Sequence, residues 1–199
     1  MSERELVARA KAGDFEAFNA LISKHKGRIF ALGKKLSGND QDAEDIVQET
    51  FMKAIDKIDQ FRGEAAFGTW LYSIALNEGR AHLSRQKQAE LKPIEAYLPS
   101  GSSSEFDAID SSRLFDWKDP HEILEAEELR SVIDDALGEL PYKYREAFLL
   151  RYSEEFSIKE IAEMIGETVA STKSRVLRAR LAVRDYLSKQ FEVRYAQKM

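Results

Sequence analysis

The 199-residue sequence contains no cysteine, only four prolines and only three histidines. The lack of cysteine excludes disulfides, thiol catalysis and metal sites built on thiolates. No window approaches the roughly 18 consecutive apolar residues that a membrane-spanning helix needs. The first residues, MSERELVARAKAGD, are charged and lack an apolar run, so we expect no signal peptide. These absences predict a cytoplasmic protein that does not insert into a membrane directly.

The composition that remains is typical of a soluble helical protein, with 33% charged and 43% hydrophobic residues. The net charge of −5 argues weakly against a protein that coats nucleic acid, but the distribution of charge matters more than its sum. The stretch from Ala170 to Arg184 carries five basic residues and no acid. This pattern favours local contact with DNA through one basic helix and contact with proteins elsewhere.

Helix caps and apolar residues at helical spacing predict an all-α fold. Ser2 and Glu5 form a capping box for a short first helix, and Asp14 can cap the next one, whose apolar stripe begins at Phe15. A turn at SGND precedes a third helix, QDAEDIVQETFMKAIDKI, and a loop, FRGEAAFG, precedes a fourth that starts near Thr69.

We expect two helical domains joined by a flexible linker. The domains cover residues 1–90 and 121–190, the linker covers 91–120, and a C-terminal tail covers 191–199. The linker is predicted because PSGSSSEFDAIDSSRLFDWKDP is rich in Ser, Asp and Gly and shows no amphipathic period.

The fourth helix, within Phe67 to Lys87, is apolar on more than one side, so neighbours must surround it. A narrow polar stripe runs along it, with Trp70 at its start; the stripe consists of Ser73, Asn77, Arg80 and Ser84. Aromatic rings stack on unpaired bases, and amide, hydroxyl and guanidinium groups bind base edges or phosphate. The alternative is structural: Trp70 is then a core aromatic and Asn77 a satisfied buried amide.

The third helix combines a buried stripe, which includes Val47, Phe51, Ala54 and Ile55, with an exposed face. That face contains Asp45, Gln48, Glu49 and Met52. Exposed carboxylates are usually only solvated, but an exposed methionine among them suits a protein-docking surface.

The most specific motif is SIKEIAEMIGETVASTKSRVLRARLAVRDYL, which predicts a helix-turn-helix. Ser157 with Glu160 caps the first helix, Gly166 makes the turn, and Thr168 caps a second helix that runs from Val169 to about Leu187. Its inward stripe contains Val169, Thr172, Val176, Ala179, Val183 and Leu187. Its opposite face presents Ser171, Lys173, Ser174, Leu177 and Arg178, with Arg175 and Arg180 at the sides. Small residues at the start permit close approach to a major groove, where Lys and Arg reach bases and phosphates. The alternative is a helical hairpin with a soluble basic face.

The stretch LPYKYREAFLLRYSEEFSIKEIAEMIGETVASTKSRVLRARLAVRDYL resembles region 4 of bacterial sigma factors of the sigma-70 family, in their extracytoplasmic-function (ECF) branch. DAEDIVQETFMKAIDKIDQFRGEAAFGTWLYSIALNEGRAHLSRQ resembles region 2 of the same branch. The two regions stand in the family's order, and the resemblance covers about residues 5–90 and 122–188.

The resemblance implies roles for particular residues. The exposed face with Asp45, Gln48, Glu49 and Met52 falls where the family docks on the β′ clamp helices of core RNA polymerase. The surface that melts and reads the −10 element corresponds to Arg62, Phe67, Trp70, Ser73, Asn77, Arg80 and Ser84. The surface that reads the −35 element corresponds to Ser171, Lys173, Ser174, Leu177 and Arg178, with Arg175 and Arg180 on phosphate. The partners implied are therefore core polymerase (the β′ clamp helices and the β flap) and promoter DNA.

The function predicted is that of a sigma factor, which binds core polymerase and directs promoter recognition and opening without catalysing a reaction itself. The alternative is a helix-turn-helix repressor or activator that never docks on polymerase; such a protein has no use for a base pocket.

An enzyme has little support, because no phosphate loop occurs and the three histidines lack metal-ligand spacing. We expect no cofactor and no metal, since helical spacing should spread the DAED carboxylates over different faces. The resemblance also implies an anti-sigma factor, which would hold the protein at the inner membrane rather than on the nucleoid.

Overall fold

The computed structural model describes residues 1–86 and 126–197, and within these ranges every regular element is a helix. The predicted all-α class is therefore confirmed. Contacts divide the chain into two compact units: Met1–Leu91 with Leu149–Thr172, and Lys92–Phe148 with Lys173–Met199. The linker predicted at 91–120 lies outside the described residues, and the predicted domain boundaries stay a prediction.

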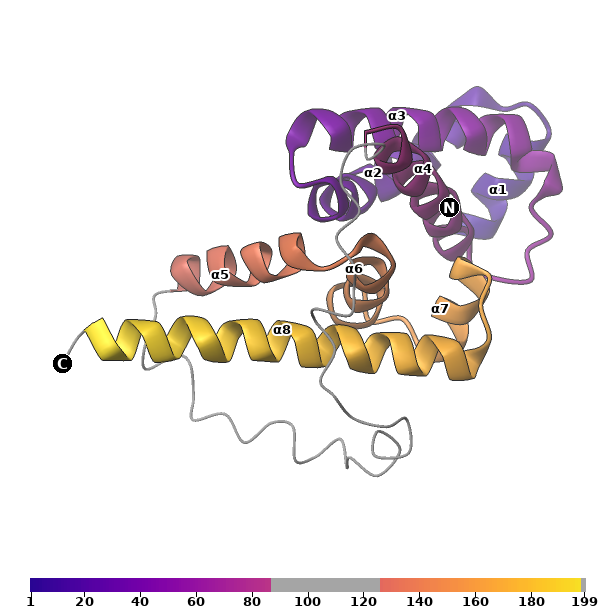
Figure 1. The fold of residues 1–199 in the computed structure, drawn as a ribbon. Coiled ribbons are helices and arrows are strands. Elements are labelled where there is room, and N and C mark those ends of the chain that lie inside the picture. The colour runs from indigo at the N-terminus through magenta and orange to yellow at the C-terminus, as the bar shows by residue number, and fades with distance from the viewer. Residues whose placement is uncertain (87–125, 198–199) are drawn as a thin grey trace. The chain divides into compact units, whose positions relative to one another are not determined.

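The first unit is built mainly on four helices: α1 (Glu3–Lys11), α2 (Phe15–Ser37), α3 (Asp40–Lys57) and α4 (Phe67–Gln86). A 3₁₀ turn, η1 (Ile58–Gln60), follows α3 directly. Helix α2 contacts the other three helices, and α3 also packs on α4 (indigo to magenta in Figure 1). The unit also contains the π-helical segment η6 (Leu149–Ser153), which sequence periodicity did not predict, and α7 (Ile158–Ile165).

The helix starts of this unit are fixed by side chains that satisfy the otherwise unpaired amides of a first turn. The capping box of Ser2 and Glu5 is complete, and Asp14 accepts a hydrogen bond from the amide of Ala17 at 3.1 Å. Asn39 caps α3 in the same way. Helix α2 ends at Gly38, whose φ of 90° is readily adopted only by glycine. These caps confirm the starts predicted for α1 and α2.

Helix α4 is buried on several sides, as predicted from its composition. Leu71 and Leu76 are fully buried, and Tyr72 and Ala75 are 1% exposed. The helix starts at Phe67, two residues before the predicted Thr69. Burial of this many apolar groups from one helix provides much of the driving force for packing α4 among its neighbours.

The apolar stripes were predicted correctly along most of their length but not at every position. Phe15, at the first position of α2, is 65% exposed, and Ile55 near the end of α3 is 42% exposed. Both side chains fall on the predicted stripe close to a helix end, where neighbouring elements no longer cover it.

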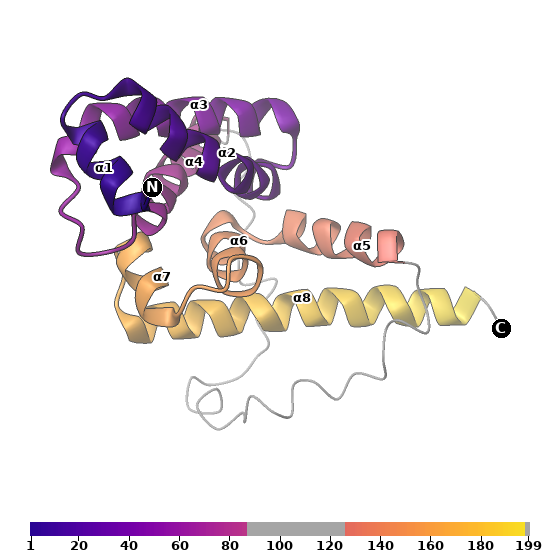
Figure 2. The same cartoon turned by 180° about the vertical axis from the view of Figure 1, so that it is seen from behind.

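The second unit contains α5 (Ala126–Glu139), α6 (Tyr142–Phe148) and most of α8 (Val169–Gln197), the long yellow helix of Figures 1 and 2. Helix α8 extends well past the predicted end near Leu187. Its inward stripe is confirmed except at its first member, since Val169 is 53% exposed. Buried Arg145 donates to the carbonyl oxygens of Gly138 at 2.6 Å and Leu140 at 3.1 Å, which satisfies acceptors at the end of α5.

Among the described helices, none combines the length and the apolar character required to cross a bilayer.

Candidate nucleic-acid interface

The polar stripe of α4 lies at the surface, not in the core. Asn77 and Ser84 are exposed, and Ser73 and Arg80 are half-buried. Arg80 donates to the side-chain oxygen of Asn77 at 3.3 Å, so the two groups present their polar atoms side by side. An exposed amide next to a guanidinium can meet a base edge and a phosphate together. The structural alternative is therefore wrong for Asn77, which is not a buried amide.

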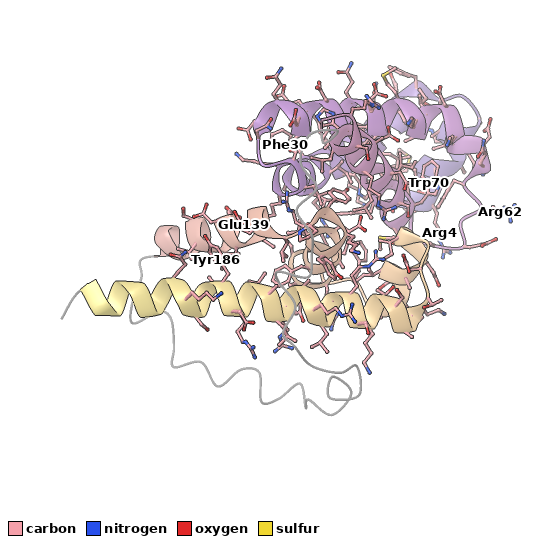
Figure 3. The ribbon with its side chains drawn as sticks, viewed as in Figure 1. Arg4, Phe30, Arg62, Trp70, Glu139 and Tyr186 are labelled. Atoms are coloured by element: carbon pink, nitrogen blue, oxygen red, sulfur yellow. The ribbon has the colours of Figure 1, made fainter. Side chains whose placement is uncertain are left out.

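Trp70 belongs to an aromatic cluster at the start of α4. Its ring centroid lies 5.2 Å from that of Phe61 and 5.5 Å from that of Phe67. Trp70 is half-buried, so the cluster supports one part of the indole while another part faces solvent (labelled in Figure 3). A rigid, partly exposed aromatic ring of this kind is suited to stacking on an unpaired base.

Phe67, at the first position of α4, is largely buried. It is 4% exposed and packs against Phe61, Trp70 and the ring of His25. Its side chain holds the loop before α4 against the bundle and also lines the pocket that this loop forms with α1. The contact between Phe67 and DNA stays a prediction.

The loop Arg62–Ala66 forms one wall of a pocket of about 650 Å³. The opposite wall is α1, which contributes Arg4 and Lys11 among its lining residues. Arg62 and Arg4 lie at the same end of the first unit in Figure 3. The cavity has room for one nucleobase with part of its backbone, and three cations line it.

Sequence reasoning missed the basic residues of α1. Arg4 and Lys11 are seven positions apart, a spacing that puts two side chains on one helical face. That spacing was a usable signal. What it could not show was that the loop after α3 would lie opposite this short helix.

His25 supports the loop from beneath. Its ring lies 5.7 Å from that of Phe67, and its Nε2 is 3.3 Å from a carboxylate oxygen of Glu3. Burial lowers the pKa of His25 below its usual value, and the neighbouring Glu3 carboxylate opposes that shift only in part. The packing of α1, α2 and the start of α4 around His25 therefore favours its neutral imidazole.

The candidate docking face on α3 has the exposure predicted for it. Asp45, Gln48 and Glu49 are exposed, and Met52 is 53% exposed. With the exposed Ile55 one turn beyond Met52, the helix presents a mixed acidic and apolar strip. Such a strip can bury a methionine against a partner while its carboxylates meet basic groups at the rim.

The expectation that the DAED carboxylates lie on different faces is wrong for Asp42 and Asp45. Their carboxylates lie close to His82 of α4, and ligand atoms from the three side chains are all within 4.8 Å of one another. His82 Nε2 is 2.9 Å from Asp42 Oδ1.

The local geometry of the helix-turn-helix motif matches the prediction. Ser157 and Glu160 complete a capping box, and α7 ends at Gly166, whose φ is 70°. Thr168 Oγ1 then accepts from the amide of Ser171 at 3.1 Å and caps α8. Both caps and the turn are therefore confirmed.

The start of α8 presents the predicted polar face. Lys173 and Ser174 are exposed, and Ser171, Leu177, Arg178 and Arg180 are half-buried. Ser171 donates to Glu167 at 2.9 Å, so its hydroxyl is engaged in the free protein.

Arg175 does not extend freely from this face. Its guanidinium is 3.5 Å from Glu146 of α6, and the two side chains are 15% and 1% exposed. A buried carboxylate requires a partner, so the guanidinium stabilises the packing of α6 on α8.

Comparison with known proteins identifies both halves of the chain. The family descriptions "Sigma-70 region 2" and "Sigma-70, region 4" match residues 21–89 and 130–183. The ECF RNA polymerase sigma-E factor of Haemophilus influenzae is 34% identical, with 90% of this chain and 92% of that protein aligned. The sigma-E factor of Escherichia coli is 33% identical, with 92% and 93% aligned.

A solved structure agrees with these relatives. The sigma factor RpoE of Bartonella quintana, in complex with the anti-sigma factor NepR, superposes with a TM-score of 0.61 and 26% identity. The match covers 86% of this chain and 96% of that one. The chain belongs to the sigma-70 family of bacterial RNA polymerase sigma factors, in its extracytoplasmic-function branch.

Proposed function

We propose that this sigma factor docks on core RNA polymerase through Asp45, Gln48, Glu49 and Met52 of α3, and opens promoter DNA through α4 and the loop before it. The factor itself catalyses no reaction in this scheme; polymerase supplies the chemistry. The observation that carries the proposal is the pair of exposed Asn77 and half-buried Arg80, which lies on the same helix as the half-exposed Trp70. A stacking ring followed by an edge-reading amide is the combination that an unpaired base requires.

The pocket between α1 and the loop is the proposed place for a base that leaves the stack. Unstacking a base costs a few kcal/mol, which stacking and edge hydrogen bonds must offset. Arg4, Lys11 and Arg62 around the cavity would attract the phosphates on either side of such a base. Glu64, also on the loop, would select against bases that place an acceptor beside its carboxylate.

Helix α8 is the proposed reader of the −35 element. Lys173, Ser174, Leu177 and Arg178 would meet base edges, with Ser171 and Arg180 at the margin and toward phosphate. Arg175 positions α8 through its contact with Glu146 in this proposal, and its contact with phosphate is secondary.

We also propose an anti-sigma factor as a partner in the cytoplasm, because the Bartonella sigma factor was solved in complex with one. The exposed apolar groups Met52 and Ile55 are suited to be covered in such a complex. An anti-sigma factor anchored at the inner membrane would then hold this protein there until its release.

The test is run-off transcription with purified core polymerase on fragments of the source genome. Wild type is compared with Asn77→Ala, Gln48→Ala and the control Asn19→Ala, which removes an exposed amide from α2 outside both faces. We expect transcripts with wild type and Asn19→Ala. Asn77→Ala should form the complex with core polymerase but open promoters poorly, and Gln48→Ala should weaken the complex itself. A protein that binds duplex DNA but never associates with core would contradict the proposal.

A further inference from the structure

The group formed by Asp42, Asp45 and His82 brings a nitrogen ligand and two carboxylates together from two helices. One ligand atom from each side chain lies within 4.8 Å of the other two, and His82 Nε2 is 2.9 Å from Asp42 Oδ1. We propose that this triad, which we call the α3–α4 triad, binds a divalent transition-metal ion of the zinc or cobalt class.

The ligand chemistry selects the metal class. Imidazole nitrogen suits zinc, cobalt, nickel and copper, whereas magnesium and calcium sites are built from oxygen ligands. One imidazole and two carboxylates leave an open position for water, as in zinc sites with three protein ligands. The acidic residues alone would not support this assignment; the imidazole from a second helix does.

The separations fit a metal ion after small side-chain movements. With bonds of about 2.0–2.1 Å, ligand atoms in a tetrahedral zinc site lie about 3.3 Å apart. The His82–Asp42 separation of 2.9 Å is close to that value, and no separation within the triad exceeds 4.8 Å. Asp45 is exposed, so its carboxylate can turn toward the ion without disturbing the core.

The backbone around the triad is held firmly. Asp42 and Asp45 are three positions apart on α3, which puts their carboxylates on one face. Asn39 donates to Asp42 Oδ2 at 2.7 Å, so that oxygen is oriented while Oδ1 faces His82. Outer hydrogen bonds of this kind orient the ligands of metal sites. Close approach of Gly33 of α2 to Ala43 further fixes the first turn of α3.

A bound ion would engage Asp45, which also belongs to the proposed docking face. This consequence rests on the proposed function: zinc would withdraw a carboxylate from the polymerase interface and weaken docking. Metal binding itself does not depend on that function and is measured separately.

The direct test titrates cobalt chloride into the full-length, tag-free protein after treatment with a chelator, and follows visible d–d absorption. We expect one equivalent of cobalt to bind, and zinc chloride to displace it. His82→Asn and Asp45→Asn should each weaken binding by about ten- to a hundredfold or more, since even the loss of an outer partner has that effect. Asp56→Asn is the matched control, because it removes an exposed carboxylate from the same helix outside the triad.

Absence of the absorption band, or equal affinity in wild type and both triad variants, would overturn the site. Circular dichroism checks that each variant is folded, and the exposed position of Asp45 keeps the test valid if His82→Asn unfolds the protein. Run-off transcription with and without zinc tests the consequence. Loss of transcripts with zinc in wild type but not in His82→Asn supports it, and equal inhibition of both overturns it. Failure to transcribe without metal would count against the proposed function instead.

Discussion

Replacing Arg175 by methionine asks whether this guanidinium stabilises the second unit or chiefly binds phosphate. Glu146 is 1% exposed and lies 3.5 Å from Arg175, which is 15% exposed. Methionine retains most of the apolar volume and removes the guanidinium group, with its charge and its hydrogen-bond donors. The change removes one cation from beside a buried carboxylate, and removal of one partner from a buried pair typically costs about 3–5 kcal/mol.

The size of the loss has a ceiling, because a carboxylate that loses a neighbouring cation can take up a proton. For a carboxyl with an ordinary pKa of about 4.3, protonation costs about 4 kcal/mol at pH 7 and about 1 kcal/mol at pH 5. We therefore expect Arg175→Met to lower the free energy of unfolding by about 3 kcal/mol at pH 7 and by no more than about 1 kcal/mol at pH 5. The deficit should shrink steadily as the pH falls between these values.

The assay is urea unfolding of the full-length protein at pH 5, 6 and 7, with hydrogen exchange of α6 and α8 peptides to locate the loss. Arg178→Met is the matched control, since it removes a half-buried arginine from the same helix and should change unfolding by about 0.5 kcal/mol or less. Adding Glu146→Gln to Arg175→Met should recover much of the stability at pH 7, because the buried charge is then gone. If Arg175→Met leaves unfolding unchanged at pH 7 yet weakens DNA binding, the structural assignment of Arg175 is refuted.

Three further changes test the structure elsewhere. Lys53→Met removes the cation whose Nζ lies 2.6 Å from both carboxylate oxygens of Glu78. Because the lysine side chain is 42% exposed and water can replace it, we expect the free energy of unfolding in urea to fall by about 1–2 kcal/mol. An unchanged free energy of unfolding would contradict the pairing. In Gly166→Ala the added methyl group has no neighbour within 4 Å, but alanine must adopt a φ of 70°, so thermal unfolding should show a stability lower by about 1–2 kcal/mol. Gly138→Ala, inside α5, should leave stability unchanged or raise it. Because the pKa of His25 is lowered in the folded protein, the unfolded chain binds more protons than the folded one below about pH 6.5. Stability should therefore fall as the pH falls from 7 to 5, by at most about 1.4 kcal/mol per pH unit. His25→Gln should flatten this pH dependence.

The elements that could be predicted from the sequence depend on residues a few positions apart. The capping boxes of Ser2 and Ser157 and the turn at Gly166 are local, and the structure reproduces them. The family assignment was predictable for a related reason, since both motifs are continuous stretches of chain. The exposed docking face on α3 also follows from helical period alone.

The limits of prediction appear where a side chain's surroundings come from another element. Helical period put Phe15 and Ile55 on an inward stripe, but it could not show that no neighbour covers them at the helix ends. It placed Arg175 at the side of a basic helix, and only the fold shows that Glu146, 29 positions earlier, takes up its charge. The family resemblance assigned Phe67 to the −10 surface, but it could not show that Phe61, Trp70 and His25 pack around its ring.

The α3–α4 triad shows the same limit at a point that bears on function. The DAED motif was treated as four residues of one helix, and within one helix no nitrogen ligand is available to it. Packing of α4 on α3 supplies that ligand from 40 positions further along the chain, since His82 lies against Asp42. Because Asp45 is common to the triad and to the proposed docking face, an ion bound there and polymerase would compete for one carboxylate. Such competition requires only that the ion bind the free factor more tightly than the factor docked on polymerase. The metal affinities of the free and the docked factor therefore decide whether the triad regulates docking.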